Sequence, residues 1–419
     1  MGLQGEISLP GDKSISHRAL MFSALSDGVC RLQNLNPGAD VATTRDALIN
    51  CGIHIEEKNG VLHVQGGGLR PFSQPELALS CGNSGTTARL MMGLLAAHPL
   101  HIQFIGDPSL SRRPMDRVFR PLMQMGANVS ARDHKFMPVM LSGRELWALD
   151  YSLPFASAQV KSAILLAGLY AKGDTSVKSP AFSRDHTEQM LSAMGADIKV
   201  SGRSVTVKPL KKALKATDMT VPGDFSAAAF FIAAALLVPE SEVVIRGVGV
   251  NPTRIGFMEV AQEMGGKITL ANLREENGES TADLKIVSSS LKGLEIHPER
   301  IANLIDELPL IALLASQAEG ETLVRGAAEL RVKESDRINS IVTNMSAWGA
   351  KIFEQPDGFT IEGPSELKGG PVQTFDDHRI AMTMSIAGLI SKQPVRLDNP
   401  ACVDISHPGF FEELRKLQS

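Results

Sequence analysis

The chain has 419 residues, of which 43% are hydrophobic and 21% are charged, and its formal net charge at pH 7 is −4. This length exceeds what one ordinary hydrophobic core supports and predicts two domains or more. The slightly acidic balance gives no general attraction to nucleic acid or to an anionic membrane surface, so any anion-binding site has to be built locally.

Neither the cysteines nor the apolar segments point to secretion or to a membrane. The four cysteines show no metal-ligand spacing and no Cys-x-x-Cys motif, as is typical of reduced cysteines in a cytoplasmic protein. The longest apolar run, from Ala227 to Val238, is too short to span a bilayer. The N-terminus lacks the basic and apolar regions of a signal peptide. We therefore expect a cytoplasmic protein.

Six apolar helices rich in small residues are predicted along the chain, and a polar or charged cluster opens each of them. They begin near Ser16, Thr86, Ala158, Ser226, Glu307 and His378, at intervals of 68 to 81 residues. A spacing this regular indicates one supersecondary unit that is used repeatedly. The ionic residues of the best motifs lie at or beside these helix starts, where free N–H groups and the helix dipole favour anions.

A second repeat alternates with the first. Amphipathic helices end in a Cys-Gly, Met-Gly or Trp-Gly pair, with the glycine at Gly52, Gly126, Gly195, Gly265 and Gly349. This glycine is expected in the left-handed conformation that closes a helix. A strand–turn–strand segment follows each pair, and Phe410–Leu417 is a sixth such helix without a hairpin. One unit is therefore a strand, an apolar helix, a strand, an amphipathic helix and a hairpin.

Six units make two groups of three, and turn sequences mark where the chain passes between the groups. Pro-Gly-Asp occurs at residues 10–12 and again at 222–224. We predict an N-terminal lobe of residues 12–223 and a C-terminal lobe of residues 1–11 plus 224–419. The first strand then belongs with the C-terminal half. Two short crossings make a hinge, and a cleft between such lobes is a natural place for a ligand.

Motifs at the first two helix starts suit an anion. Lys13 and Arg18 flank a helix start that Ser14 or Ser16 can cap, and this combination suits a phosphate or a carboxylate. The alternative is a capped surface helix with solvated charges. At the next start, Gly85 removes a side chain where backbone amides can cradle an anion. The same Gly-Asn-Ser-Gly segment is also an ordinary turn into a helix.

Three further motifs follow in the N-terminal half. A proline after Arg113 suits the first turn of a helix, which places this arginine at the helix cap. Ser157 and Gln159 open the third apolar helix and offer the uncharged hydrogen bonds that select sugar-like hydroxyls. The Ser-Arg-Asp-His-Thr-Glu segment that begins with Ser183 and Arg184 has the spacing of a capping box.

The C-terminal half combines carboxylates with cations. Asp306 opens an apolar helix, where an acid is a good cap and is also held in place for proton transfer. If the segment Arg331–Arg337 is helical, Lys333 shares a face with its last arginine; an ion-paired solvent face is the alternative. Arg379 lies in the first turn of the last apolar helix, where its charge opposes the dipole unless an anion or an acidic partner compensates.

The joint pattern resembles the 5-enolpyruvylshikimate-3-phosphate synthase family almost from end to end. The resembling segments, in the family's order and spacing, are Pro10-Gly11-Asp12-Lys13-Ser14-Ile15-Ser16-His17-Arg18, Gly82-Asn83-Ser84-Gly85-Thr86, Arg113-Pro114, Ser157-Ala158-Gln159, Arg331-Val332-Lys333-Glu334-Ser335-Asp336-Arg337 and Asp377-His378-Arg379. The family implies a two-lobed inside-out α/β barrel of six βαβαββ units, three per lobe, with helices inside and sheets outside.

The resemblance implies a transferase of the shikimate pathway of aromatic amino acid biosynthesis. Such an enzyme moves the enolpyruvyl group of phosphoenolpyruvate to the 5-hydroxyl of shikimate 3-phosphate and releases phosphate, by addition and elimination through a tetrahedral intermediate. The residues implied for shikimate 3-phosphate are Lys13, Ser14, Arg18, Ser157, Gln159, Ser183, Arg184, Asp306 and Lys333. Those implied for phosphoenolpyruvate are Lys13, Gly85, Arg113, Gln159, Arg337 and Arg379.

The reaction needs a proton delivered to the methylene carbon and a proton removed from the hydroxyl. We expect Asp306 as the base at the 5-hydroxyl, with Lys13 and Glu334 as proton donors or relays, and which of the three serves which half-reaction stays open. The resemblance implies no metal and no organic cofactor; we expect a monomer, although the sequence does not give the oligomeric state. Glyphosate, which the family binds in the phosphoenolpyruvate pocket, is an expected inhibitor because Gly85 leaves room for it.

Three positions depart from the family pattern, and two other functions remain as rivals. Ala158 replaces a serine, Glu329 replaces an asparagine of some members, and Val403–Ile405 lacks a lysine that some members carry, so one contact to phosphoenolpyruvate is missing or replaced. The sister enzyme that acts on UDP-N-acetylglucosamine carries Lys-Asn where this chain has Lys13-Ser14, and its loop cysteine is absent here. A non-catalytic, anion-binding repeat scaffold is the rival of a different class.

Overall fold

The structure, a computed structural model, describes residues 2–418 and consists of two compact units. The N-terminal unit comprises Gly11–Val221 together with Glu276–Glu279, and the C-terminal unit comprises Met1–Pro10, Pro222–Glu275 and Ser280–Ser419. The predicted lobe boundaries put the short segment Glu276–Glu279 in the C-terminal lobe. It is the tip of a hairpin, and its contacts assign it to the N-terminal unit.

Each sheet of the N-terminal unit has four strands in one recurring order. The first two strands are parallel, and the third and fourth form an antiparallel hairpin that pairs with the second. The three sheets are β13 (Met219–Thr220), β2 (Val29–Gln33), β4 (Val61–Gln65) and β3 (His54–Lys58); β5 (Leu79–Ser80), β6 (His101–Ile105), β8 (Phe136–Ser142) and β7 (Asn128–Arg132); and β9 (Asp150–Ser152), β10 (Thr175–Lys178), β12 (Ser204–Val207) and β11 (Ile198–Ser201).

The C-terminal unit repeats this order twice and then shortens it. Its four-stranded sheets are β1 (Gln4–Ser8), β14 (Glu242–Gly249), β16 (Glu279–Val287) and β15 (Lys267–Glu276); and β17 (Glu295–Ile296), β18 (Gly320–Val324), β20 (Gly358–Gly363) and β19 (Lys351–Gln355). The last sheet contains only β21 (Pro371–Val372) and β22 (Arg396–Leu397). The predicted absence of a sixth hairpin is thus confirmed.

The first sheet of each unit includes one strand that lies next to a point where the chain passes from one unit to the other. Strand β1 pairs in parallel with β14, so that Gln4 lies opposite Glu242, although more than two hundred residues separate them. In the same way β13, the last strand of the N-terminal unit, pairs in parallel with β2, with Met219 opposite Leu32. In each unit the first sheet therefore contains a strand that is distant along the chain from the strand it pairs with.

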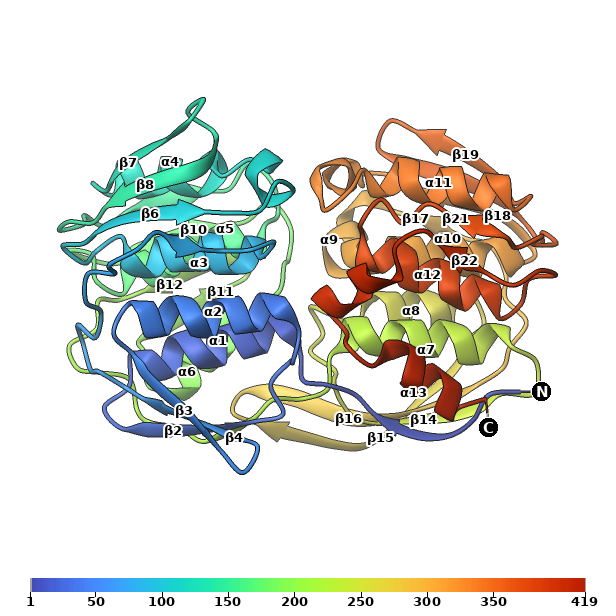
Figure 1. Cartoon of the computed structure of the whole chain (residues 1–419), viewed down its shortest axis with the longest axis horizontal. Helices are drawn as coiled ribbons and strands as arrows, with labels where there is room; N and C mark the ends of the chain where they lie inside the picture. The colour runs from blue at the N-terminus through green and yellow to red at the C-terminus, as the bar shows by residue number, and fades with distance from the viewer. Residues whose placement is uncertain (1, 419) are drawn as a thin grey trace. The chain divides into compact units, whose positions relative to one another are not determined.

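Six inner helices form the centre of the two units. They are α1 (Lys13–Ala24), α3 (Gly85–Leu95) and α5 (Ala158–Gly168) in the N-terminal unit and α7 (Phe225–Leu237), α10 (Leu308–Gln317) and α12 (His378–Gly388) in the C-terminal unit. They are buried almost along their full length because nearly every side is apolar or small. Figure 1 shows the strands on the outside of each unit and these helices within it. The predicted inside-out α/β fold is confirmed.

The outer helices carry the second repeat. They are α2 (Ala39–Asn50), α4 (Asp116–Gln124), α6 (His186–Ala193), α8 (Gly256–Glu263), α11 (Arg337–Ala347) and α13 (Phe410–Lys416), and a short helix α9 (Ile301–Leu304) precedes α10. All five predicted closing glycines have a positive φ, between 89° and 113°. That conformation costs glycine little, and it turns the chain from the helix into the hairpin.

Side-chain caps begin five of the six inner helices in the described part of the chain. The caps are Asp12, Ser84, Ser157, Asp224 and Asp377, each of which accepts a hydrogen bond from a backbone N–H of the first turn. The prediction that Ser14 or Ser16 caps α1 is wrong: Asp12 does so, because a carboxylate one residue before the helix reaches the N–H of Ile15. Helix α10 begins directly after Glu307, whose side chain does not cap it.

Each unit has a hydrophobic core of its own, and the cysteines lie inside them. All four cysteines are free and buried, and burial raises the pKa of the Cys51, Cys81 and Cys402 thiols to about 12. Within residues 2–418 no helix has both the length and the apolar character needed to cross a membrane.

The closest approach of inner helices predicts one sensitive glycine. A Cβ atom added at Gly93 on α3 would lie 2.2 Å from the carbonyl oxygen of Ala163 on α5, where the backbone cannot move aside cheaply. We expect Gly93→Ala to lower the free energy of unfolding by about 2 kcal/mol through overpacking. Denaturant titration measures this loss. Gly249→Ala is the control, since its Cβ has only ordinary contacts at 3.5 Å; equal stability of both variants would contradict the packing argument.

Candidate active site

The predicted residues of the N-terminal unit gather at the starts of its three inner helices. Lys13 is the first residue of α1, Gly85 is the first residue of α3, and Ser157 caps α5. Inner helices are apolar, so these starts are where polar groups can approach the centre of the unit while the unpaired N–H groups of the first turn remain available. Each start therefore offers N–H donors beside a functional side chain.

Two cations near the start of α1 contact neighbouring helices. The Lys13 ammonium lies 3.0 Å from the Asp40 carboxylate on α2. One turn later Arg18 is buried, and it donates hydrogen bonds to Thr187, to Ser162 and to the backbone oxygen of Ser14 at 2.7 to 2.9 Å. These contacts join α1 to α5 and α6 and hold the guanidinium in one orientation.

Burial governs the electrostatics of Arg18. Burial lowers the pKa of its guanidinium to about 10, although the nearby Glu188 and Asp12 act in the opposite direction. The positive charge of Arg184 lowers it further. At neutral pH the group remains charged, yet its direct hydrogen-bond partners are neutral oxygens. A desolvated cation of this kind is stabilised by an anionic ligand.

Ser183 lies beside this arginine network. Lys161 of α5 forms a buried ion pair with Glu188 of α6 at 2.5 Å and contacts the backbone oxygen of Ser183. The Ser183 hydroxyl is itself buried and has no hydrogen-bond partner among the described residues. The predicted capping box is wrong: α6 begins after Asp185 without a side-chain cap, because Glu188 is engaged by Lys161. Ser183 is thus free for a ligand.

The α3 start contacts the α5 start through an arginine. Arg89 donates to the side-chain oxygen of Gln159 at 2.7 Å, and the Gln159 amide donates to the Thr86 hydroxyl at 2.9 Å. A Cβ atom added at Gly85 would lie 2.5 Å from an Arg89 nitrogen and 3.7 Å from an Arg113 nitrogen. Glycine at position 85 therefore lets the Arg89 guanidinium approach the first turn of α3, while the contact to Arg113 would be an ordinary one.

Arg113 reaches this place from a different element than predicted. It follows a short 3-10 helix, Leu110–Arg112, in an extended conformation, and α4 begins only at Asp116. The prediction that Arg113 caps a helix is wrong because the proline after it stays outside α4. Its guanidinium is buried and donates to the side chain of Asn83 at 2.6 Å and to Ser109 at 3.2 Å.

A chain of buried hydroxyls supports both helix starts. His17 on α1 contacts Thr44 at 2.6 Å, Thr44 contacts Thr87 at 2.7 Å, and Thr87 donates to Ser84, the cap of α3. Burial lowers the pKa of His17 well below its usual value, and the charges of Lys13 and Arg18 lower it further. The imidazole is therefore neutral at physiological pH and adds no charge to the cluster.

The predicted residues of the C-terminal unit form one connected cluster around Asp306. This carboxylate accepts hydrogen bonds from Lys333 and from Arg337, each at 3.3 Å, and is largely buried. Arg379 donates to the backbone oxygen of Asp306 at 3.1 Å. Glu334 joins through Arg337, at 2.6 Å. A carboxylate held between a lysine and an arginine is held in one orientation, as a general base requires.

Arg337 is the most heavily paired of these cations. It is buried, and besides Asp306 and Glu334 it contacts Asp377, at 2.8 Å. Burial alone would lower the pKa of Arg337, but the carboxylates raise it above its usual value, with Asp377 contributing most. Burial alone would raise the pKa of Asp377, yet the Arg337 charge outweighs it and holds that pKa below its usual value.

The segment Arg331–Arg337 is not one continuous helix, so the condition on which Lys333 and Arg337 were expected to share a helix face is not met. Residues Ala328–Val332 form a 3-10 helix, Lys333 is extended, and α11 begins only at Arg337. Lys333 and Arg337 nevertheless meet at the same carboxylate. The predicted acidic partner of Arg379 is Glu307, at 3.4 Å. The site cations of this unit that are described above are therefore each paired with a carboxylate.

Several residues of both clusters were not among the predicted site residues. Asp40 and Glu188 pair with cations of the N-terminal unit, Arg89 orients Gln159, and Glu307 and Asp377 pair with cations of the C-terminal unit. Arg89 had a detectable signal, since it lies one helical turn after Gly85 and so shares its face. Glu188 and Asp377 lie within motifs that the sequence singled out, but those motifs do not name their ionic partners. The acids are distant in sequence from their partners, and no local pattern reveals such pairs.

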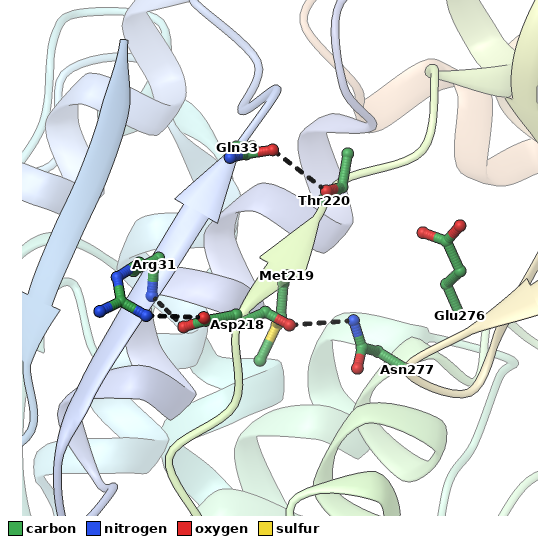
Figure 2. A pocket seen from close by; sticks show the side chains of 7 residues that line it. All are labelled: Arg31, Gln33, Asp218, Met219, Thr220, Glu276 and Asn277. Atoms are coloured by element: carbon green, nitrogen blue, oxygen red, sulfur yellow. Dashed lines mark hydrogen bonds and ion pairs between the residues drawn. The ribbon is translucent and has the colours of Figure 1, made fainter. Parts of the chain in front are cut away.

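A surface cavity lies away from all the predicted site residues. It encloses about 320 Å³ and is lined by Arg31, Gln33, Asp218, Met219, Thr220, Glu276 and Asn277. Figure 2 shows that these side chains come from β2, from β13 and its flank, and from the hairpin tip. Among residues 2–418 no cluster of three or more His, Cys, Asp or Glu side chains could hold a metal ion.

Solved structures that resemble this chain include enolpyruvyl transferases. The enolpyruvyl transferase NikO from Streptomyces tendae matches all of this chain and 95% of its own, with a TM-score of 0.80 at 17% identity, which shows a common fold. An EPSP synthase from Acinetobacter baumannii matches 99% of this chain and 96% of its own, with a TM-score of 0.88 at 40% identity. The fold and the helix-start clusters thus define the enolpyruvyl transferase class.

Sequence comparison places the chain within that class. The family model for EPSP synthase (3-phosphoshikimate 1-carboxyvinyltransferase) matches residues 1–414. A 3-phosphoshikimate 1-carboxyvinyltransferase of Thermoanaerobacter sp. is 48% identical over 98% of this chain and 96% of its own length, and one of Bacillus subtilis is 46% identical over 99% and 97%. The chain belongs to the EPSP synthase family. It is therefore an enzyme of enolpyruvyl transfer in aromatic amino acid biosynthesis, as the sequence analysis predicted.

The Asp377–Arg337 pair predicts a pH-dependent stability. A carboxylate whose pKa is held down in the folded state stabilises it above its ordinary pKa, about 4, and this contribution is lost as the pH falls. We expect Asp377→Asn, which can still cap α12, to lower the free energy of unfolding by about 3 kcal/mol at pH 7 and to flatten its decline towards pH 3. Urea titrations at both pH values test this. The exposed Asp404→Asn should behave like the wild type; a common pH profile for the three proteins would refute the assignment.

Proposed function

We propose that the enolpyruvyl transfer of this enzyme is an addition followed by an elimination, and that both clusters act on the same pair of reactants. Phosphoenolpyruvate is the donor, the 5-hydroxyl of shikimate 3-phosphate is the acceptor, and phosphate leaves. One observation carries this proposal: the chain has buried cations at the starts of inner helices, and it also has a carboxylate, Asp306, that a lysine and an arginine hold in place. This combination supplies both anion binding and proton transfer.

The N-terminal cluster supports binding of shikimate 3-phosphate. A phosphate needs cations and hydroxyl donors, and Arg18, Arg184 and the unpartnered Ser183 hydroxyl lie in neighbouring parts of one network. We assign the remaining polar contacts of this substrate to Lys13, Ser14, Ser157 and Gln159, with Asp306 and Lys333 from the C-terminal cluster. Neutral hydrogen-bonding groups suit the ring hydroxyls, and cations suit the phosphate.

Phosphoenolpyruvate requires a second group of cations. The first turn of α3 with Gly85, together with Arg113, Gln159 and Lys13, offers backbone N–H groups and charges for an anion. From the C-terminal cluster we assign Arg337 and Arg379. The two guanidinium groups are already oriented by carboxylates, so binding costs little side-chain entropy.

We assign the proton transfers of both steps to Asp306, Lys13 and Glu334. In the addition step Asp306 takes the proton of the 5-hydroxyl, whose oxygen then bonds to C2 of phosphoenolpyruvate, while the methylene carbon receives a proton from Lys13 or Glu334. In the elimination step the methyl group returns a proton, the double bond re-forms, and phosphate leaves. Lys13 and Glu334 both remain candidates for each of these proton transfers.

We also propose that the enzyme acts in the cytoplasm as a monomer. Four free, buried thiols suit a reducing compartment. Each unit has its own extensive hydrophobic core, so neither depends on a partner subunit to bury its apolar surface. Glyphosate is proposed as an inhibitor that competes with phosphoenolpyruvate.

The proposed proton transfers are tested by phosphate release. Wild-type protein should release phosphate only when phosphoenolpyruvate and shikimate 3-phosphate are both present, and not when UDP-N-acetylglucosamine replaces the acceptor. Lys13→Ala and Asp306→Ala should each lower kcat by about a hundredfold or more, since each removes a group of the proton-transfer machinery. Lys392→Ala, at an exposed ion pair with Glu366, is the control. A variant that folds and retains near-normal turnover would remove its residue from the mechanism.

The space beside Gly85 predicts the response to glyphosate. In Gly85→Ala the new methyl group would stand 2.5 Å from an Arg89 nitrogen, so this guanidinium must move and the pocket for the donor narrows. We expect the inhibition constant of glyphosate to rise by at least about tenfold, with a smaller rise of KM for phosphoenolpyruvate. Competitive inhibition assays on both proteins measure this. Equal inhibition constants would contradict the assignment of Gly85 to the donor pocket.

A further inference from the structure

Glu307 is a buried carboxylate that the mechanism above does not use. It is 1% exposed and follows directly after Asp306. Its Oε1 atom accepts a hydrogen bond from the Ser226 hydroxyl at 2.5 Å and faces an Arg379 nitrogen at 3.4 Å. Its Oε2 atom is buried and accepts no hydrogen bond within the described residues. One oxygen of this carboxylate therefore makes both of these contacts.

The position of Glu307 in the fold makes this use of the side chain unusual. In five of the six inner helices of the described chain the residue before the first turn caps the helix with its side chain. Glu307 occupies that place in α10 and caps nothing. Its carboxylate instead contacts the second residue of α7, Ser226, and the second residue of α12, Arg379. The starts of three inner helices thus meet at one side chain.

Ser226 is itself held in place on the other side. Arg254 donates a hydrogen bond to the Ser226 hydroxyl at 2.7 Å and lies 3.6 Å from the Asp224 carboxylate that caps α7. Since the serine oxygen accepts from Arg254, its proton is directed to Glu307. The sequence of contacts is therefore Arg254 to Ser226 to Glu307 to Arg379, and all four side chains are buried.

We propose that Glu307 is a positioning residue that fixes the Arg379 guanidinium for phosphoenolpyruvate. This inference rests on the proposed role of Arg379 in binding that substrate. Two groups on successive residues hold the same guanidinium nitrogen: the Glu307 carboxylate and the backbone oxygen of Asp306. The proposed base and the anchor of the donor-binding arginine therefore share one turn of chain, and the placement of donor and base is coupled.

Glu307→Gln is the sharpest test because it changes charge with little change in shape. The amide oxygen can keep the place of Oε1, and the amide nitrogen replaces Oε2, which has no hydrogen bond to lose. Without the negative charge the hold on Arg379 weakens. We expect KM for phosphoenolpyruvate to rise about tenfold, which corresponds to about 1.4 kcal/mol, while KM for shikimate 3-phosphate stays within about twofold.

Ser226→Ala is a milder second variant that leaves the carboxylate intact. It removes the hydrogen bond that orients Oε1, so KM for phosphoenolpyruvate should rise about threefold, in the same direction as in Glu307→Gln. Ser316→Ala is the matched control: among the described residues the hydroxyl of this buried serine bonds only within its own helix α10, to Leu313 and Gln317. It should alter neither KM value.

The outcomes separate positioning from mere stabilisation. A selective rise of KM for phosphoenolpyruvate in both variants, larger than any in Ser316→Ala, supports the proposal. Loss of thermal stability or a lower kcat with both KM values unchanged, or a parallel rise of both KM values, overturns it. Arg379→Lys, assayed alongside, tests the assignment of Arg379 to phosphoenolpyruvate binding. If this variant leaves KM for phosphoenolpyruvate unchanged, the proposed role of Arg379 fails. If Arg379→Lys raises that KM but Glu307→Gln has no effect, only the positioning role of Glu307 fails.

Discussion

The structure depends on burying charge at the starts of helices that are otherwise apolar. Inner helices such as α7 expose almost nothing, so a charged side chain at their first turn loses most of its hydration. It can remain only if hydrogen bonds and opposite charges replace the water. In the N-terminal unit hydroxyls and backbone oxygens surround Arg18, and in the C-terminal unit carboxylates surround Arg337. The same networks that make burial tolerable also orient the groups that the reaction needs.

The two kinds of network around buried arginines suit different chemical roles. A guanidinium held by neutral oxygens, as at Arg18, retains its full charge for a ligand, which favours a phosphate. A guanidinium already paired with several acids, as at Arg337, adds less net charge but fixes the carboxylates around it. Anion binding and proton transfer are thus assigned to different kinds of network, and each is built from the first turns of inner helices within its own unit.

Much of the fold was predictable because repetition makes weak local signals add up. A single Met-Gly pair says little, but five such glycines at similar intervals indicated the outer helices, and each adopts the expected positive φ. Local chemistry failed where a tertiary contact competed for the same side chain. Glu188 has the spacing of a capping residue yet pairs with Lys161, and Arg113 lies in an extended segment because α4 starts later than its proline suggests. Acids such as Glu307 and Asp377 could not be assigned, because their partners are distant in sequence and only the folded chain brings them together.

The hairpin tip between β15 and β16 limits how this molecule can be divided. Asn277 and Gly278 both have a positive φ, so the tip is a tight turn, and it belongs with the N-terminal unit although both strands belong to a sheet of the other. Its Glu279 forms a buried pair with His186 at 2.6 Å. A gene fragment cut at the two obvious boundaries, near residues 11 and 221, would therefore omit four residues of that unit and leave an interior imidazole without its carboxylate. Although the chain is built from repeated units of sequence, a single contiguous piece of it does not contain a complete N-terminal unit.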